Sequence, residues 1–308
     1  MKFVVALLAT SMFVLPAFAD GILDIDKLSQ DLTTLQKQIA ELTSKPVWNK
    51  QAMNKQIDET NFVVTGKKAM TRINPENGKP EHGVQNSTGS ATLIDREHGI
   101  FLSASHVGEL DDLTLATLKV GGTKTEETDY EISNRFKILA PIHDLALLHT
   151  EDKLPTNITA SKLACNDPER GDTVYAVGNP LGIYGTVTKG IVTTRLYNAL
   201  HENVNTKVMG TDAAVEHGAS GGAVYNEKGE IVGVVSAMHG SQTAGVFIPV
   251  STIQAFLVAA SRKTGLDPKN FIAQPCDNQF TQSQHMKLVD PEELPKKPEP
   301  EKKKEENK

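Results

Sequence analysis

Residues 216–237, EHGASGGAVYNEKGEIVGVVSA, set a serine among glycines just ahead of two short apolar runs. The runs, residues 221–226 and 229–237, are separated by polar turn-forming residues, which predicts two successive strands. Ser220 has two interpretations, a nucleophile held on a tight turn or a small residue in a glycine-rich hairpin. The stretch by itself fits both, so the choice depends on the rest of the chain.

The same alternation of short β-branched runs and turn residues extends from about residue 60 to residue 250. Eleven runs occur in about 190 residues without long helical patterns between them, which predicts an antiparallel all-β sandwich or barrel. A helical pattern follows at residues 251–265, with Ser251 as the expected N-cap and Gly265 as the expected C-cap. The runs are NFVVTG, GSATLID, GIFLSAS, LTLATLKVGG, RFKILAPI, DLALLHT, TVYAVGNP, GTVTKGIVTTRL, GGAVYN, GEIVGVVSA and AGVFIPV.

A serine hydroxyl is a weak nucleophile unless a base takes its proton, and that base must itself be oriented. His106 follows a strand-turn-strand pattern at residues 89–107, and Asp144 opens an apolar run. A carboxylate buried there needs a partner, which an imidazole N–H would supply. His143 is adjacent, but neighbouring residues of a strand point to opposite faces. Taken singly, His106 also fits a histidine packed at a strand end, and Asp144 a solvent-facing residue at a strand start.

The three candidates occur in the order His106, Asp144, Ser220, with separations of 38 and 76 residues. This is the order of chymotrypsin-like enzymes and differs from the orders of subtilisin and the α/β-hydrolases. The separations place the histidine and the aspartate on one unit of about 90 residues and the serine on the next. The site is therefore expected in the cleft between two barrels.

The chain resembles trypsin-like serine proteases of the high-temperature-requirement (HtrA) type over about residues 60–262. The resemblance implies an all-β fold, a chymotrypsin-like double β-barrel with a C-terminal helix. It places the protease domain at residues 60–265, with barrels at about 60–155 and 158–250. The motifs that carry it are SASHV, HDLALL, YAVGNPLGIYGTVTKGIV, TDAAVEHGASGGAVYNEKGEIVGVVSA and AGVFIPV.

The resemblance also implies roles for individual residues. It makes His106 the general base, Asp144 its orienter and Ser220 the nucleophile. The backbone N–H groups of Gly218 and Ser220 would form the oxyanion hole, and neighbouring glycines permit the tight backbone that such a hole requires. No metal or cofactor is expected, and the substrates would be polypeptides.

The chain departs from the usual Asn-Ser-Gly-Gly-Pro of the family, because Ala219 and Ala223 stand at its first and last positions. Ala219 has no side chain that could anchor the oxyanion turn by a hydrogen bond. Glu216 and His217 replace the usual neutral residues just before Gly218. A protease domain without the peptide-binding PDZ domain of many relatives is expected.

The primary specificity pocket is expected to be uncharged. By the resemblance, Ala214 forms its floor, residues 245–247 from Gly245 onward form its back, and one wall consists of Ser236, Ala237 and Met238. A lysine or arginine side chain entering this pocket would lose its water without gaining a counter-ion. We therefore expect cleavage after apolar residues.

The N-terminus predicts export and self-association. Residues 1–19 combine an early lysine, an apolar run too short to span a bilayer and an Ala-Phe-Ala cleavage site, which indicates a signal peptide and a periplasmic or secreted protein. Residues 20–46 carry a heptad seam that favours an N-terminal coiled-coil helix and a homo-oligomer, although one amphipathic helix packed on its own domain is the alternative. The seam consists of Ile25, Leu28, Leu32, Leu35, Ile39 and Leu42.

Charge and composition limit the partners. The net charge of −6 is spread along the chain without a basic patch, which argues against nucleic-acid binding. Cys165 and Cys276 are the two cysteines, and in an exported protein they either form a disulfide or remain separate buried thiols. Residues 286–308 are rich in proline, glutamate and lysine and are expected to form a disordered tail.

The sequence thus favours an exported serine endopeptidase that hydrolyses peptide bonds through an acyl-enzyme. The alternative is a catalytically weak protease-like protein that binds or assembles through its oligomerising stalk.

Overall fold

The computed structural model divides the chain into two units, Met1–Pro46 and Val47–Lys308. In the first unit, residues 30–36 are helical and exposed, and the predicted signal peptide and the rest of the predicted coiled coil lie outside the described residues. Most of the predicted tail lies outside them as well. The structure describes residues 30–36, 48–75, 78–119, 126–132, 137–194, 197–201, 204–236, 245–273, 276, 286 and 288–289.

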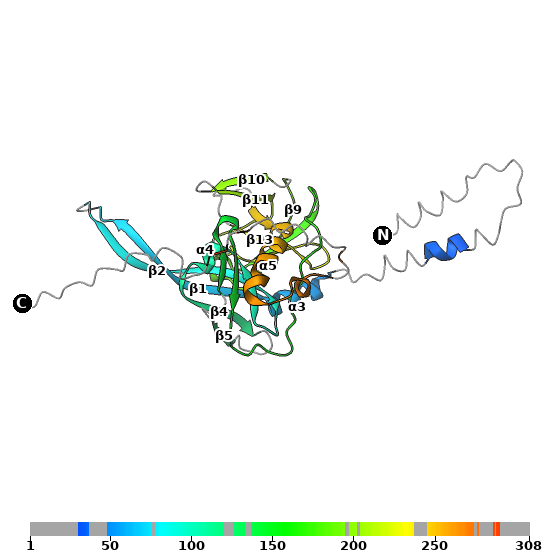
Figure 1. Cartoon of the computed structure of the whole chain (residues 1–308), viewed down its shortest axis with the longest axis horizontal. Helices are drawn as coiled ribbons and strands as arrows, with labels where there is room; N and C mark the ends of the chain where they lie inside the picture. Colours follow the sequence, from blue (N-terminus) through cyan, green and yellow to red (C-terminus); the bar gives the residue numbers. More distant parts are fainter. Residues whose placement is uncertain are drawn as a thin grey trace, which may run out of the picture. The chain divides into compact units, whose positions relative to one another are not determined.

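The first sheet has seven antiparallel strands in the order β5-β4-β1-β2-β3-β7-β6 (Figure 1). The short helix α4 (Ser105–Gly108) follows β3, and the 3₁₀ turn η2 (Pro141–His143) lies between β6 and β7. The strands are β1 (Asn61–Ile73), β2 (Pro80–Asp95), β3 (Ile100–Ser103), β4 (Asp111–Lys119), β5 (Glu126–Glu131), β6 (Ile138–Ala140) and β7 (Leu145–His149).

The second sheet also has seven antiparallel strands, in the order β10-β11-β14-β13-β12-β8-β9. The 3₁₀ turn η3 (Pro180–Gly182) links β8 to β9. The prediction of two successive β-rich units in an all-β fold is confirmed. The strands are β8 (Thr173–Gly178), β9 (Thr186–Ile191), β10 (Tyr197–His201), β11 (Val204–Thr211), β12 (Ala223–Tyr225), β13 (Ile231–Val235) and β14 (Gly245–Pro249).

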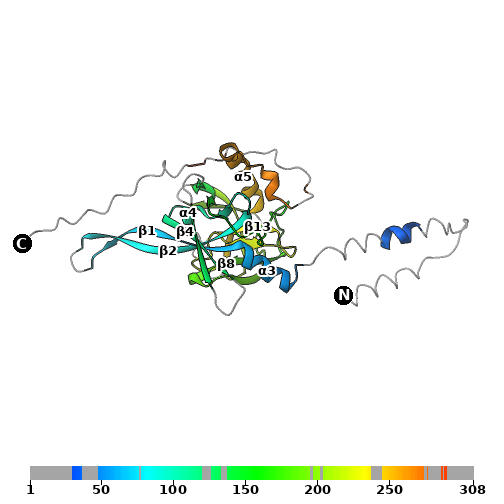
Figure 2. The same ribbon diagram turned by 90° about the horizontal axis from the view of Figure 1, so that it is seen from below.

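The hairpin of β1 and β2 is longer than the sequence runs suggest. Its register continues without a break from Asn61 opposite Thr92 to Ile73 opposite Pro80. The base of β1 is buried, and the residues from Lys67 onward are exposed. Figure 2 shows this outer half as a two-stranded ribbon that leaves the body of the second unit.

The core joins the two sheets through a helix. Phe62 and Phe101 pack edge to face within the first sheet, with their ring centroids 4.9 Å apart. Phe256 lies on α5 (Val250–Thr264) and belongs to a buried cluster that contains Leu102 of the first sheet and Ile248 of the second. The predicted C-terminal helix is therefore confirmed, and it supports both halves of the molecule.

The caps of α5 match the prediction at one end only. Gly265 is the C-cap, with a left-handed φ of 72° and its N–H on the Ser261 carbonyl. The helix begins at Val250, so the predicted N-cap Ser251 lies inside its first turn. The carboxylate of Asp167 accepts hydrogen bonds from the Ser251 backbone N–H (2.8 Å) and Oγ–H (2.7 Å). A residue distant in sequence thus replaces the local cap.

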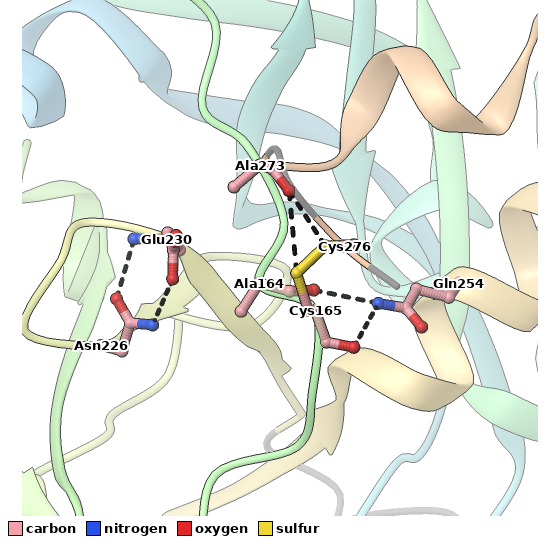
Figure 3. Close-up of a disulfide and its surroundings, with 7 residues drawn as sticks. All are labelled: Ala164, Cys165, Asn226, Glu230, Gln254, Ala273 and Cys276. Carbon is pink, nitrogen blue, oxygen red and sulfur yellow. Dashed lines mark hydrogen bonds between the residues drawn. A yellow bond between two sulfur atoms is a disulfide. The ribbon is translucent and has the colours of Figure 1, made fainter. Parts of the chain in front are cut away.

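Cys165 and Cys276 form a disulfide in the structure, with Cα atoms 5.5 Å apart and a sequence separation of 111 (Figure 3). The bond links the segment between β7 and β8 to the chain that follows η4 (Pro268–Phe271). Gln254 of α5 donates to the carbonyls of Ala164 and Cys165 beside it. The disulfide therefore fixes the C-terminal segment next to the helix.

The sequence analysis did not anticipate the helix that precedes β1 or the 3₁₀ turn η4 that follows α5. Helix α3 (Lys50–Thr60) is capped by Asn49, whose side chain accepts from the Ala52 N–H at 2.9 Å. Among the described residues, no helix is long and apolar enough to cross a membrane.

Candidate active site

His106 and Asp144 are brought together where two neighbouring strands of the first sheet meet, the end of β3 and the start of β7. His106 lies on α4, and its Nδ1 is 2.8 Å from Asp144 Oδ1. The same oxygen accepts from the His106 backbone N–H at 3.1 Å. Asp144 is only 2% exposed, and its other oxygen accepts a 2.5 Å hydrogen bond from Ser236 Oγ. The buried carboxylate is thus satisfied by side chains of both sheets.

Asp144 does not open β7 as the sequence predicts. It precedes the strand as the residue that ends η2, with a left-handed φ of 52°. Aspartate tolerates this conformation better than most residues do. His143 points to a different partner, since its Nδ1 lies 3.4 Å from Thr206 Oγ1. The two neighbouring side chains are therefore separated by the turn and not by the pleat of a strand.

The charge of Asp144 controls the pKa of His106. Partial burial of the ring favours the neutral imidazole, but the hydrogen bond to Asp144 and its negative charge outweigh this effect, with a contribution from Glu109. The pKa of His106 is therefore raised above its ordinary value. The pKa of His143 is lowered, because burial and the charge of Lys207 both disfavour its protonated form.

Ser220 is buried on a glycine turn between Ala219 and β12. Gly218 and Gly221 adopt left-handed φ values of 97° and 86°, and a Cβ at Gly218 would lie 2.6 Å from the Asn179 carbonyl oxygen. A Cβ at Gly221 would collide with the carbonyl oxygen of Ser90. Both positions therefore require glycine. This requirement is consistent with a tight turn that presents Ser220.

Two backbone N–H groups flank the nucleophile candidate without protein partners. Within the described part of the chain, neither Gly218 N nor Ser220 N donates a hydrogen bond. The carbonyl of His217 accepts from Leu181 N at 2.9 Å, so the trans peptide turns the Gly218 N–H to the opposite side. Two such donors can bind a developing oxyanion.

The structure brings Ser220 toward His106 through the contacts of its turn. Ser90 N donates to the Ser220 carbonyl at 2.8 Å, and Gly221 lies against Ala104, two residues before His106. No hydrogen bond joins the described residues Ser220 and His106. Such contacts between base and nucleophile often tighten only when a substrate is bound.

The predicted specificity pocket is described in part. Ala214 is exposed, and its carbonyl accepts a hydrogen bond from Thr188 Oγ1 at 2.7 Å. Gly245, on β14, pairs with Thr211 of β11. Ala237 and Met238 lie outside the described residues. The side chain of Ser236, expected along the pocket wall, binds Asp144 instead.

Two serines make contacts at the candidate site that the sequence analysis did not foresee. Ser236 follows an apolar run and Ser90 lies inside one, so both look like ordinary strand residues. Ser90 Oγ donates to the Gly218 carbonyl at 2.7 Å. No local pattern reveals either contact, because each partner is distant in sequence. Within the described residues, no group of three or more His, Cys, Asp or Glu side chains is placed to hold a metal ion.

Comparisons with known proteins identify similar sequences and similar folds. Residues 89–234 match the family described as trypsin-like peptidase domain. The periplasmic serine endoprotease DegP of Escherichia coli (strain K12) is 34% identical over 151 residues, which are 49% of this chain and 30% of DegP. The putative serine protease HhoA of Synechocystis sp. (strain ATCC 27184 / PCC 6803 / Kazusa) is 30% identical over 171 residues, 54% of this chain and 41% of HhoA.

Among solved structures, the HtrA-type protease AlgW with a tripeptide has a TM-score of 0.52 and 26% identity, and the match covers 69% of this chain and 63% of that one. The double β-barrel fold is thereby confirmed. The matched region spans less than half the length of the two curated relatives.

Proposed function

We propose, on the premise that residues 89–234 form a trypsin-like peptidase domain related to the HtrA proteases, that this protein is a serine endopeptidase. The observation that carries the proposal is the hydrogen bond between His106 and the buried Asp144, beside a glycine turn that presents Ser220. Its substrates are polypeptides, and no observation favours a binding protein without turnover.

The hydrogen bonds of Asp144 define the protonation of the base. A carboxylate only accepts hydrogen bonds, so neutral His106 carries its proton on Nδ1 and leaves the lone pair of Nε2 free. In the proposed reaction this lone pair takes the proton of Ser220 Oγ as the oxygen attacks the substrate carbonyl. The positive imidazolium that results lies against the negative Asp144, which stabilises it.

The backbone amides of the turn complete the proposed reaction. The oxyanion of the tetrahedral intermediate accepts hydrogen bonds from the N–H groups of Gly218 and Ser220. The imidazolium of His106 then gives its proton to the leaving amine, and an acyl-enzyme ester remains on Ser220. Water, activated by the same histidine, hydrolyses this ester and restores the free hydroxyl.

The test is mass spectrometry of the products from unfolded casein, with wild-type protein and the Ser220→Ala variant. We expect Ser220→Ala and His106→Ala each to lower kcat by about 10⁶-fold, and the double variant to be little worse, because the residues act as a unit. A fluorophosphonate probe should label wild-type protein at Ser220. Casein cleavage that survives in Ser220→Ala would disprove the assignment.

We also propose that the protein is exported to the periplasm, in line with the apolar leader of residues 1–19 and with the printed name of its relative DegP. The mature chain is expected to begin at Asp20. N-terminal sequencing of the protein purified from the periplasmic fraction tests this, and material that still begins at Met1 would contradict it.

A further inference from the structure

The oxyanion turn is anchored from the opposite sheet. The side chain of Ala219 cannot hold the turn, yet the peptide groups on both sides of it are held. Ser90, on β2 of the first sheet, donates from Oγ to the Gly218 carbonyl at 2.7 Å and from its backbone N to the Ser220 carbonyl at 2.8 Å. One buried residue therefore holds the carbonyls of Gly218 and Ser220, the residues on either side of Ala219.

The direction of the Ser90 hydroxyl proton is determined by its other partners. A hydroxyl has one proton to donate and two lone pairs. Asn179 donates to both lone pairs of Ser90 Oγ, from its backbone N at 2.9 Å and from its Nδ2 at 3.1 Å. The proton of the hydroxyl is then left for the Gly218 carbonyl. All of these groups are buried.

The amide of Asn179 is itself oriented by backbone groups. Its Oδ1 accepts from the Gly185 N–H at 2.9 Å, and its Nδ2 donates to the Phe62 carbonyl at 2.9 Å. Because a backbone N–H only donates and a carbonyl only accepts, the amide cannot be turned over. Asn61 adds a bond from its Nδ2 to the same Oδ1 at 2.7 Å.

We propose that Ser90 is a positioning residue for the oxyanion hole, and that Asn179 orients its hydroxyl toward Gly218. Glycine at position 218 leaves the backbone free to rotate. A flip of the peptide between His217 and Gly218 would turn the Gly218 N–H out of the oxyanion hole. Leu181 N holds the peptide before Gly218, and Ser90 Oγ holds the one after it. The inference rests on the proposed function, since the hole matters only if an oxyanion forms.

The test compares Ser90→Ala with Ser161→Ala as a matched control. Ser161 is also a buried serine, with bonds to Tyr225, Thr60 and Gln56, so both variants lose one buried hydroxyl. Removing a donor from an oxyanion hole typically costs about 10²–10³-fold in kcat. Ser90→Ala keeps both donors and only loosens their positions, so the fall in kcat should be smaller than this. We expect Ser90→Ala to lower kcat about tenfold or more, with KM changed less than about twofold.

Affinity for a peptide boronate reports the hole directly, because its tetrahedral adduct with the nucleophile places an oxygen there. The inhibition constant should rise in Ser90→Ala by about the same factor as kcat falls. Ser161→Ala should keep kcat, KM and this constant, although it also lowers the denaturation midpoint. Equal kinetic effects of the two substitutions, or none in Ser90→Ala, would overturn the inference while the proposed function stands.

A second measurement does not depend on turnover. The N–H of Ala219 shares a peptide with the Gly218 carbonyl and donates to the Glu216 carbonyl at 3.0 Å. We expect the Ala219 amide to exchange its hydrogen at least about tenfold faster in Ser90→Ala than in wild type or Ser161→Ala, as observed by NMR. An inactive wild-type protein would refute the proposed function, and unchanged exchange would refute the role of Ser90.

Discussion

The hydrogen bonds of the buried Asp144 carboxylate both stabilise its charge and orient His106. Burying a charge without partners is costly, and here one oxygen binds His106 while the other binds Ser236. These bonds fix the ring orientation and the tautomer of the base. The negative charge also raises the pKa of His106, so protonation of the base extends to higher pH than for a free histidine.

The raised pKa of His106 predicts the pH dependence of cleavage. The protonated ring cannot accept the proton of Ser220, so kcat/KM should be low in acid and rise as the pH passes the pKa of His106. Because this pKa is raised, the midpoint should lie above the ordinary value of 6.5. A pH profile of peptide cleavage measures it, and a flat profile between pH 5 and 8 would contradict the role of His106.

Two substitutions serve as controls for this profile. Asp144→Asn removes the charge, so the midpoint should move to lower pH and kcat should fall by about 10⁴-fold, because the amide no longer fixes the tautomer. His143→Ala should leave the midpoint unchanged, since His143 contacts Thr206 and not Asp144. A shift caused by His143→Ala would mean that the wrong histidine has been assigned.

The specificity pocket expected from the sequence, with its uncharged lining, predicts the residue before the cut. Burial of an apolar side chain gains about 0.8 kcal/mol per CH₂, whereas a lysine or arginine would lose its hydration. Cleavage should follow Ala, Val, Leu or Met with mild preferences among them, because one methylene is worth about 1–3 kcal/mol. A peptide library varied at this residue measures the preference. Dominant cleavage after Lys or Arg that Glu216→Gln abolishes would show that the exposed Glu216 lines the pocket.

Strands were predictable where a short apolar or β-branched run marks them, the edge strands β6 and β9 included. The eleven predicted runs correspond to strands of the structure, but β5, β10 and β11 were missed. β5 reads EETDYE and pairs only with β4, and β10 pairs only with β11, so neither needs an apolar face. The polar helix α3 was missed for the same reason, since only Ile57 and Thr60 are buried in it.

Residues of the candidate site could be predicted where a local motif marks them, and not where their partners are distant in sequence. His106, Asp144 and Ser220 could be singled out because each lies in a recognisable motif. Ser90 was not singled out, and Ser236 was expected only along the pocket wall, since the contacts of both serines are with partners on the opposite sheet. The prediction of Ser251 as the N-cap of α5 was wrong for a similar reason, because the side chain that accepts from the first turn is that of Asp167, which is distant in sequence.

The disulfide between Cys165 and Cys276 predicts a large effect on stability. It closes a loop across a sequence separation of 111 residues, for which the chain-entropy model gives at most about 4–5 kcal/mol. Denaturant unfolding of a Cys165→Ser/Cys276→Ser variant should show a loss of this order, and reduced wild-type protein should match it. Two free thiols counted in exported, denatured, unreduced protein would contradict the pairing.

The assembly of whole molecules should depend on the N-terminal helix. Leu32 and Leu35 are each 47% exposed on the helical residues 30–36, and such an apolar seam favours a helical partner. Deletion of residues 20–46 should lower the mass measured by light scattering, and so should Leu32→Glu with Leu35→Glu. Polar-face changes at Thr33 and Gln36 should not. An unchanged mass after the deletion would exclude the helix as the assembly element.

The division of the candidate site between two sheets also determines when proteolytic activity can begin. The first sheet contributes His106, Asp144 and Ser90, and Ser220 and Ser236 belong to the second. A chain emerging from the ribosome, or threaded unfolded through a membrane, holds these groups far apart. Proteolysis by the enzyme that we propose can start only after strands of the second sheet have folded against the first, so a chain that is still unfolded cannot cleave other proteins.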